Sequence, residues 1–193
     1  MHVRSLMMLV VIAAAVLVAS AADGSSRQSA VPAVRADSDS VFLRATAEAL
    51  ERMTPCEVTD VIDGDTIRCA ALGRVRLLLI DSPERDQKPW GGRARESLAA
   101  MIPVGSSVRL ETDVQLRDRY GRLLAYLYRL DGLQVNEMMV RNGFAEVLVY
   151  PPNVRHVDVL RRAREAAREA RRGLWSTEAF ECAPRDHRAD SCE

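Results

Sequence analysis

Residues 56–71 read CEVTDVIDGDTIRCAA, and this stretch decides the expected fold. Two runs that contain β-branched residues, 57–62 and 65–70, flank the pair Asp63-Gly64. An Asp-Gly pair between such runs is among the strongest short signals for a β-hairpin. The stretch therefore predicts two antiparallel strands joined by a tight turn.

A third strand is expected over residues 74–80. Regular alternation along it would place Arg76 and Asp81 on opposite faces. Because Pro83 cannot pair regularly in a sheet, the strand should end before it, and a loop should occupy residues 82–90. Acidic side chains that follow the strand would then lie at the mouth of the sheet, in contact with water.

The rest of the body alternates between strand and helix patterns. Further extended pieces are expected at 107–113, 122–130 and 144–150, and helices at 93–102, 135–142 and 155–172, with a short helix at 41–53. Five strands with a helix between the third and the fourth are typical of an OB-type Greek-key barrel. The expected fold class is α+β: a five-stranded OB-type barrel with three helices.

The two ends of the chain differ from its body. A basic start, an apolar run from Leu6 to Val18 and an Ala-x-Ala end predict a signal peptide over 1–21 and a secreted or periplasmic protein. An uncleaved N-terminal anchor is the alternative, although the run is short for a membrane span. After cleavage no membrane association is expected. The other expected parts are a linker with a possible short helix at 22–54, the main domain at 55–175 and a polar, irregular, cysteine-containing tail at 176–193.

Four cysteines in an exported chain favour two disulfides. Cys56 and Cys69 flank the hairpin turn and could face each other across it, which would leave Cys182 to pair with Cys192 in the tail. Free buried thiols are an alternative. A zinc site is a weaker one, because the usual Cys/His ligand spacing is missing.

Charge is balanced over the chain as a whole. There are 27 basic and 27 acidic residues, and 48% of the residues are hydrophobic. This composition permits a packed core and excludes a histone-like polycation or an acidic solvating protein. The expected helix at 155–172 carries seven arginines against three acidic residues. A solvated helix face is the favoured interpretation, and phosphate steering is the alternative.

Three charged segments carry the candidate chemistry: DGDT at 63–66, RLLLIDSPE at 76–84 and DRYGR at 118–122. Asp65 and Asp81, with a backbone carbonyl, would form an all-oxygen site that suits Ca²⁺ or Mg²⁺ better than Zn²⁺. Glu84 could accept a proton from an attacking water. Arg76 and Arg122 could neutralise charge on a phosphoryl transition state. Together the segments favour metal-assisted hydrolysis of phosphodiesters.

These motifs resemble the staphylococcal nuclease (thermonuclease) family. The matching stretches are 61–66, 75–84, 118–128, 135–147 and 150–175, which cover nearly the whole body. The resemblance implies Ca²⁺-dependent cleavage of single-stranded or unwound DNA and RNA by a monomer, with 3′-phosphate products. It implies that Asp65, Asp81 and the Ser82 carbonyl bind Ca²⁺, and that Glu84 acts as base or orients water. It implies that Arg76 and Arg122 clamp the phosphate. It also implies that Arg119 and Tyr120 lie near the terminal phosphate and that Tyr150 lines the nucleobase pocket.

The sequence departs from the family pattern at three places. Ser82 stands in place of threonine, and little effect is expected because the ligand is its backbone oxygen. The loop after Glu84 is several residues shorter and Leu148 occupies the place of a second pocket tyrosine, and these two changes concern substrate preference and affinity more than the chemistry. Two other functions remain open. One is a catalytically inactive barrel that binds nucleic acid or protein, and the other is an exported structural or envelope-interaction protein. The presence of all five catalytic-type charged residues favours the enzyme.

Overall fold

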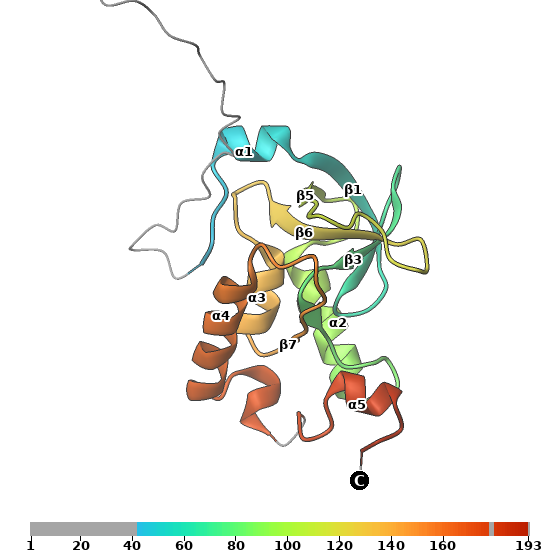
Figure 1. Ribbon diagram of the computed structural model, residues 1–193, viewed down its shortest axis with the longest axis vertical. Helices are drawn as coiled ribbons and strands as arrows, with labels where there is room; N and C mark the ends of the chain where they lie inside the picture. Colours follow the sequence, from blue (N-terminus) through green and yellow to red (C-terminus); the bar gives the residue numbers. More distant parts are fainter. Residues whose placement is uncertain (1–41, 178–179, 193) are drawn as a thin grey trace, which may run out of the picture. The chain divides into compact units, whose positions relative to one another are not determined.

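A computed structural model describes residues 42–177 and 180–192 of the chain, so the expected signal peptide and most of the expected linker lie outside the described residues. Five strands close into a barrel in the order β1-β2-β3-β6-β5 (Figure 1). They are β1 (Thr54–Val61), β2 (Thr66–Cys69), β3 (Gly73–Leu77), β5 (Ser107–Glu111) and β6 (Leu123–Arg129). All neighbours are antiparallel except β3 and β6, which run parallel. The expected barrel is confirmed.

The first hairpin forms where its sequence predicts it. Val61 pairs with Ile67, and the N–H of Ile62 donates to the Thr66 carbonyl at 2.9 Å. Gly64 does not have a positive φ, so the turn requires a glycine there for its small size and not for its backbone conformation. A Cβ there would lie 2.6 Å from the Cβ of Ser82. The turn therefore packs directly against the loop that follows the third strand.

Both expected disulfides are present. Cys56 on β1 and Cys69 on β2 are bonded with their Cα atoms 5.5 Å apart. Cys182 and Cys192 are bonded with a Cα separation of 5.4 Å. The first bond ties two barrel strands together, and the second closes a loop near the end of the chain.

The third strand differs from its expected form. β3 ends at Leu77, a turn follows, and Ile80–Asp81 form a separate strand, β4, which pairs with β7 (Glu146–Val147). Leu79 adopts a φ of 62°, so the alternation expected through residue 80 is wrong. The physical reason is burial: all four apolar side chains from Leu77 to Ile80 are buried, whereas a regular strand would turn alternate ones away from the core.

Most helices lie below the barrel in the view of Figure 1, and the short helix that precedes β1 lies above it. They are α2 (Trp90–Met101), α3 (Val135–Arg141) and α4 (Val157–Glu169), with the shorter α1 (Ala47–Arg52), the 3₁₀ helix η1 (Gly173–Ser176) and α5 (Pro184–Arg188). The first three correspond to the three expected helices. The tail was expected to be irregular, and α5 shows that this was wrong for residues 184–188. In α4 an apolar stripe of Leu160, Ala163 and Ala167 is buried, and most of its arginines face solvent, as the solvated-face interpretation predicts.

The core fills the barrel and continues under α2, α3 and α4. Its centre includes Val58, Ile67, Val75, Leu110 and Ala125 from the five strands. In the part of the chain that the structure describes, no helix has the length and apolar character needed to span a bilayer.

Candidate active site

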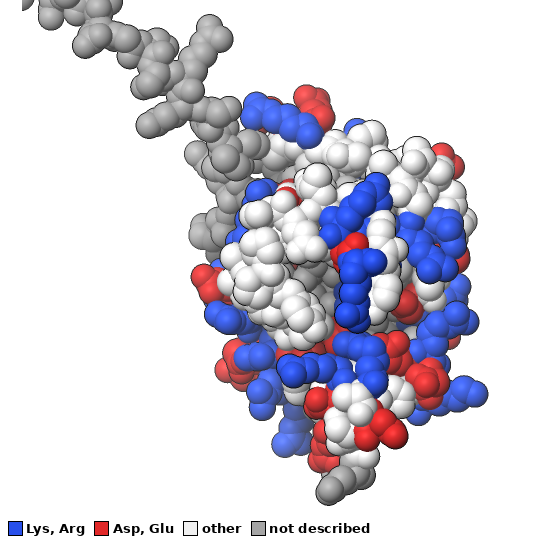
Figure 2. Space-filling model, turned by 45° about the vertical axis from the view of Figure 1, so that its right-hand side comes forward, with Lys and Arg blue, Asp and Glu red and all other residues white. Residues whose placement is uncertain are grey.

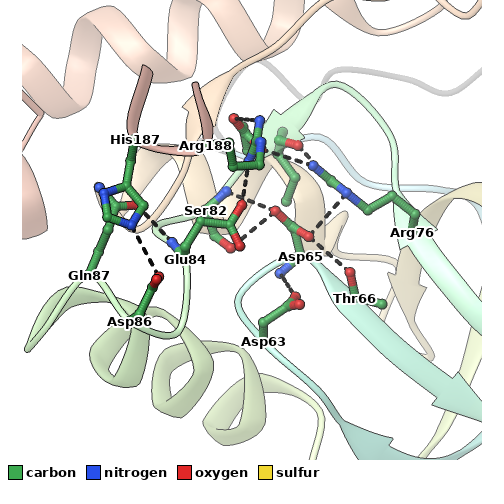
Figure 3. A network of polar contacts seen from close by, with 12 residues as sticks. Asp63, Asp65, Thr66, Arg76, Ser82, Glu84, Asp86, Gln87, His187 and Arg188 are labelled. Carbon is green, nitrogen blue, oxygen red and sulfur yellow. Dashed lines mark hydrogen bonds and ion pairs between the residues drawn. The ribbon is translucent and has the colours of Figure 1, made fainter. Parts of the chain in front are cut away.

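Asp65 is the central acidic residue of the site. It follows the hairpin turn and is only 6% exposed. Its Oδ2 accepts hydrogen bonds from the backbone N–H of Ser82 at 2.8 Å and from the Ser82 hydroxyl at 3.1 Å. Its Oδ1 lies 3.1 Å from Arg76 Nε and accepts from the Thr66 hydroxyl (Figure 3). Asp65 thus joins the hairpin, the third strand and the following loop.

Arg76 on β3 holds the kink in place. Its Nη1 donates to the carbonyls of Leu77 and Ile80 at 2.8 and 2.7 Å. Its Nη2 lies 3.1 Å from Asp81 Oδ1, so one guanidinium bridges the two candidate ligands Asp65 and Asp81. These backbone contacts exist only because the chain reverses after Leu77.

Asp81 and Glu84 complete the acidic group. Asp81 is 2% exposed, and this burial raises its pKa against the opposing effects of Arg188 and Arg76. Glu84 lies at the rim, and its side chain is 35% exposed. The start of α2 sets the position of this loop, because a Cβ on Gly91 would lie 2.0 Å from the Glu84 carbonyl oxygen. The start of the helix therefore packs directly against the backbone of Glu84.

Asp63 is a further carboxyl that sequence analysis treated only as a turn residue. Burial and the charge of Asp65 raise the pKa of Asp63 to about 6. Its Oδ1 accepts the backbone N–H of Asp65 at 3.0 Å (Figure 3). The Asp-Gly-Asp order at the turn is the only sequence signal for its place beside the site.

Arg122 belongs to a second group on the neighbouring strand. Its Nε lies 2.7 Å from Asp118 Oδ2, and its guanidinium carbon is 5.5 Å from the centre of the Tyr120 ring. Burial alone would raise the pKa of Asp118, but hydrogen bonds from Arg122 hold it below its ordinary value. Within residues 42–177 and 180–192 no ion pair joins Arg122 to Asp65, Asp81 or Glu84. The two groups are adjacent because β3 pairs with β6, with Arg76 opposite Leu124.

Two exposed aromatic rings lie on loops outside the acidic group. Tyr120 and Tyr150 are each 67% exposed. Arg119 covers Tyr120 at 4.8 Å from the ring centre and donates to its hydroxyl at 2.6 Å. Asn153 fastens the loop of Tyr150 to Gln115 through two hydrogen bonds, of 2.7 and 2.9 Å. Both residues are therefore exposed, and each has polar contacts that support its ring or its loop.

Arg188 from α5 is the residue that sequence analysis missed. Its Nη2 lies 2.8 Å from Asp81 Oδ2 and its Nη1 lies 3.0 Å from Asp81 Oδ1. Nη1 also lies 2.5 Å from Glu84 Oε1 (Figure 3). The hydrogen bonds to Asp81 raise the pKa of Arg188, which keeps it charged. No local pattern in a polar tail indicates a contact with residues more than 100 positions away.

The donor set fits a hard divalent cation. Asp65 and Asp81 supply carboxylate oxygens and the loop supplies backbone carbonyls, whereas no histidine or free cysteine contacts this group among the described residues. Arg76 and Arg188 now neutralise the same oxygens that a cation would take. A site that attracts two guanidinium groups has the excess negative charge that cation binding requires.

The face of the molecule that Figure 2 shows is mixed in charge. In Figure 2 basic side chains form a broken band down the middle of the face, with acidic side chains beside and between them. This face is therefore not uniformly basic, in keeping with the zero net charge of the whole chain. Contact with phosphates would depend on a few placed arginines.

Comparison with known proteins decides the family. The sequence profile of staphylococcal nuclease homologues matches residues 74–177. The chain belongs to the staphylococcal nuclease family. The matched region runs from β3 to the end of η1 and includes Arg76, Asp81, Glu84 and Arg122. Asp65 lies just before it, on the same barrel.

Several relatives of this nuclease-family chain are themselves described as nucleases. Endonuclease YncB and SPbeta prophage-derived endonuclease YokF, both from Bacillus subtilis (strain 168), are each 36% identical over 129 residues, which is 62% of this chain. The chain spans 60% of the first and 43% of the second. Thermonuclease from Staphylococcus hyicus is 33% identical over 128 residues, with 62% of this chain and 75% of that protein covered.

Proposed function

We propose that this protein is a Ca²⁺-dependent endonuclease that hydrolyses phosphodiester bonds in DNA and RNA. The observation that carries the proposal is the pair of buried carboxylates, Asp65 and Asp81, bridged by Arg76 at one edge of a nuclease-family barrel. Glu84 stands at the rim of the same group. A buried acidic pair of this kind is costly for folding alone and is explained by a catalytic use.

Asp65, Asp81 and the Ser82 carbonyl would hold the cation. When bound, the cation would polarise a phosphoryl oxygen and favour attack by water. Calcium is the proposed ion because it accepts carboxylate and carbonyl oxygens in irregular geometries, which suits ligands drawn from a turn, a kinked strand and a loop.

Glu84 would accept the proton of the attacking water, because its carboxylate lies at the rim where water can reach it. Arg76 would place positive charge next to the reacting phosphoryl group. Arg122 would contact the phosphate from the position just before β6, the strand that pairs with β3. Attack on the 5′ side of the phosphodiester would leave 3′-phosphate ends, as the family resemblance implies.

Single-stranded or unwound nucleic acid is the proposed substrate. Tyr120 and Tyr150 present exposed rings, and stacking of a base on such a ring contributes about 1–3 kcal/mol. We further propose that the protein is monomeric and acts outside the cytoplasm, where its two disulfides would be stable.

The test uses the mature chain with labelled single-stranded DNA and RNA, in Ca²⁺, in Mg²⁺ and in chelator. We expect cleavage in Ca²⁺ and products that a polymerase extends only after phosphatase treatment, which identifies 3′-phosphate ends. Glu84→Gln should slow cleavage by about 10²–10⁴-fold while substrate binding persists. Binding without any metal-dependent cleavage would instead favour the inactive barrel.

A further inference from the structure

The end of the chain forms a compact strap next to the acidic group. The strap comprises residues 182–192, closed by the Cys182–Cys192 disulfide and containing α5. Its sequence lies outside the region that matches the nuclease family, which ends at residue 177. The strap is therefore an addition to the shared barrel.

Three contacts fasten the strap to the loop after Glu84. Gln87 Nε2 donates to the Cys182 carbonyl at 3.2 Å. His187 Nε2 lies 3.1 Å from Asp86 Oδ1 (Figure 3). Arg188 pairs with Glu84 at 2.5 Å. The strap thus contacts three of the four residues from Glu84 to Gln87, and each contact comes from a different point along it.

Arg188 extends from the strap onto the proposed cation ligands. Its two terminal nitrogens meet both oxygens of Asp81, which is the bidentate geometry of strong guanidinium–carboxylate pairs. The Asp81 side chain is 3% exposed and that of Arg188 is 41% exposed. The pair is accordingly strong in geometry but open to solvent on the arginine side, so Arg188 can leave without disturbing the core.

We propose that residues 182–192 are an autoinhibitory strap in which Arg188 competes with the divalent cation for Asp81 and with water for Glu84. The inference rests on the proposed nuclease function. Arg188 takes both Asp81 oxygens, whereas Arg76 takes only Oδ1, so a cation that binds Asp81 would have to displace Arg188. The disulfide keeps the eleven-residue strap folded over the site, which raises the effective concentration of Arg188 there.

Removal of the disulfide should open the site. α5 has only five residues, too few to be a stable helix in water once the Cys182–Cys192 bond no longer holds its ends. Arg188 would then spend less time on Asp81. The strap therefore couples the redox state of one cysteine pair to cation affinity at a site formed by other residues.

The first experiment measures Ca²⁺ binding to the full mature chain by calorimetry, without substrate. Arg188→Gln should bind Ca²⁺ about 2- to 5-fold more tightly than the parent, which is the range expected for a partly exposed ion pair. The control is Arg185→Gln, which removes the same charge from an exposed position of the same helix and should bind as the parent does. Cleavage should need correspondingly less Ca²⁺ in Arg188→Gln alone.

The second experiment combines Cys182→Ser with Cys192→Ser and leaves Cys56–Cys69 intact. This variant should match Arg188→Gln in Ca²⁺ affinity. Addition of Arg188→Gln to it should increase the affinity little further, because both changes remove the same contact, that of Arg188 with Asp81. Thermal unfolding of each variant verifies that the barrel remains folded. If the double serine variant fails to fold, Arg188→Gln and its control still decide the proposal.

The outcomes separate this proposal from the nuclease proposal. Equal Ca²⁺ affinity in the parent and in Arg188→Gln, with metal-dependent cleavage in both, would overturn the strap and leave the nuclease. Weaker Ca²⁺ binding or slower cleavage in Arg188→Gln would also overturn it, because Arg188 would then assist the reaction. Absence of Ca²⁺ binding and cleavage in both proteins would overturn both proposals.

Discussion

Arg76 in β3 and Asp81 in β4 contact each other across the kink between these strands, with Arg76 Nη2 3.1 Å from Asp81 Oδ1. A regular strand would have placed them on opposite faces. The reversal at Leu79, with its φ of 62°, brings the arginine to the acid. One backbone irregularity therefore assembles the centre of the site.

Replacement of Arg76 by methionine should destabilise the fold strongly. The change leaves Asp65 and Asp81 buried next to each other without the bridging charge, a situation that typically costs about 3–5 kcal/mol. Urea denaturation in chelator measures the loss, and added Ca²⁺ should restore part of it. Arg74→Met, at an exposed position on the same strand, is the control and should change stability little. Equal effects of the two changes would contradict the bridging role of Arg76.

Replacement of Gly64 by alanine should destabilise the protein and impair the site. The new Cβ would lie 2.6 Å from the Cβ of Ser82 and 2.7 Å from that of Ala94, so the turn or the loop must shift, at a cost of about 1–3 kcal/mol. Gly92→Ala is the matched control, because a Cβ there meets nothing within 4 Å. Thermal unfolding should show a lower Tm for the first variant and an unchanged or higher Tm for the second. A Gly64→Ala protein as stable as the parent would refute the close approach.

Glu111 should contribute stability that disappears in acid. Burial alone would raise its pKa, but hydrogen bonds from His156, Arg155 and Tyr128 lower the pKa of Glu111 from 4.5 to about 2. Because the folded pKa is the lower one, this contribution is fully present above pH 4.5 and is lost as the pH falls toward 2. A shift of this size corresponds to about 3 kcal/mol.

Urea denaturation of Glu111→Gln and the parent over pH 2–7 measures this effect. The parent should be the more stable protein at pH 7, and the difference should shrink steadily below pH 4.5. Glu57→Gln, at an exposed position on β1, should show no such trend. A stability difference for Glu111→Gln that stayed constant down to pH 2 would rule out this network as its source.

Tyr150 should bind substrate by stacking. Tyr150→Ala should weaken the binding of single-stranded DNA by about 1–3 kcal/mol, because an exposed ring is replaced by a methyl group. Fluorescence anisotropy of a labelled oligonucleotide measures the change, and kcat should change less than KM. The control is Val154→Ala, another exposed apolar side chain nearby. Unchanged DNA affinity in Tyr150→Ala would remove this residue from the substrate site.

Several residues of the candidate site could be identified from local sequence patterns. Asp65 and Asp81 were identified from two short motifs, and the structure joins them through Arg76. Their local order suffices because a turn and a strand end each expose polar side chains at defined places. Arg122 was identified in the same way, but the structure places it with Asp118 and Tyr120 rather than among the acids. Sequence spacing predicts which strand carries a side chain better than which partner it meets.

The sequence alone determined the hairpin at residues 63–66, the five barrel strands and the three main helices. Each of these depends on apolar spacing within a few residues, so the information is local. Only the tertiary structure decided the kink at Leu79 and the contact of Arg188 with Asp81, residues that are 107 positions apart. The kink allows four consecutive apolar side chains to be buried, and the contact with Arg188 neutralises part of the negative charge of a buried acidic group. Both needs arise only when the barrel is closed.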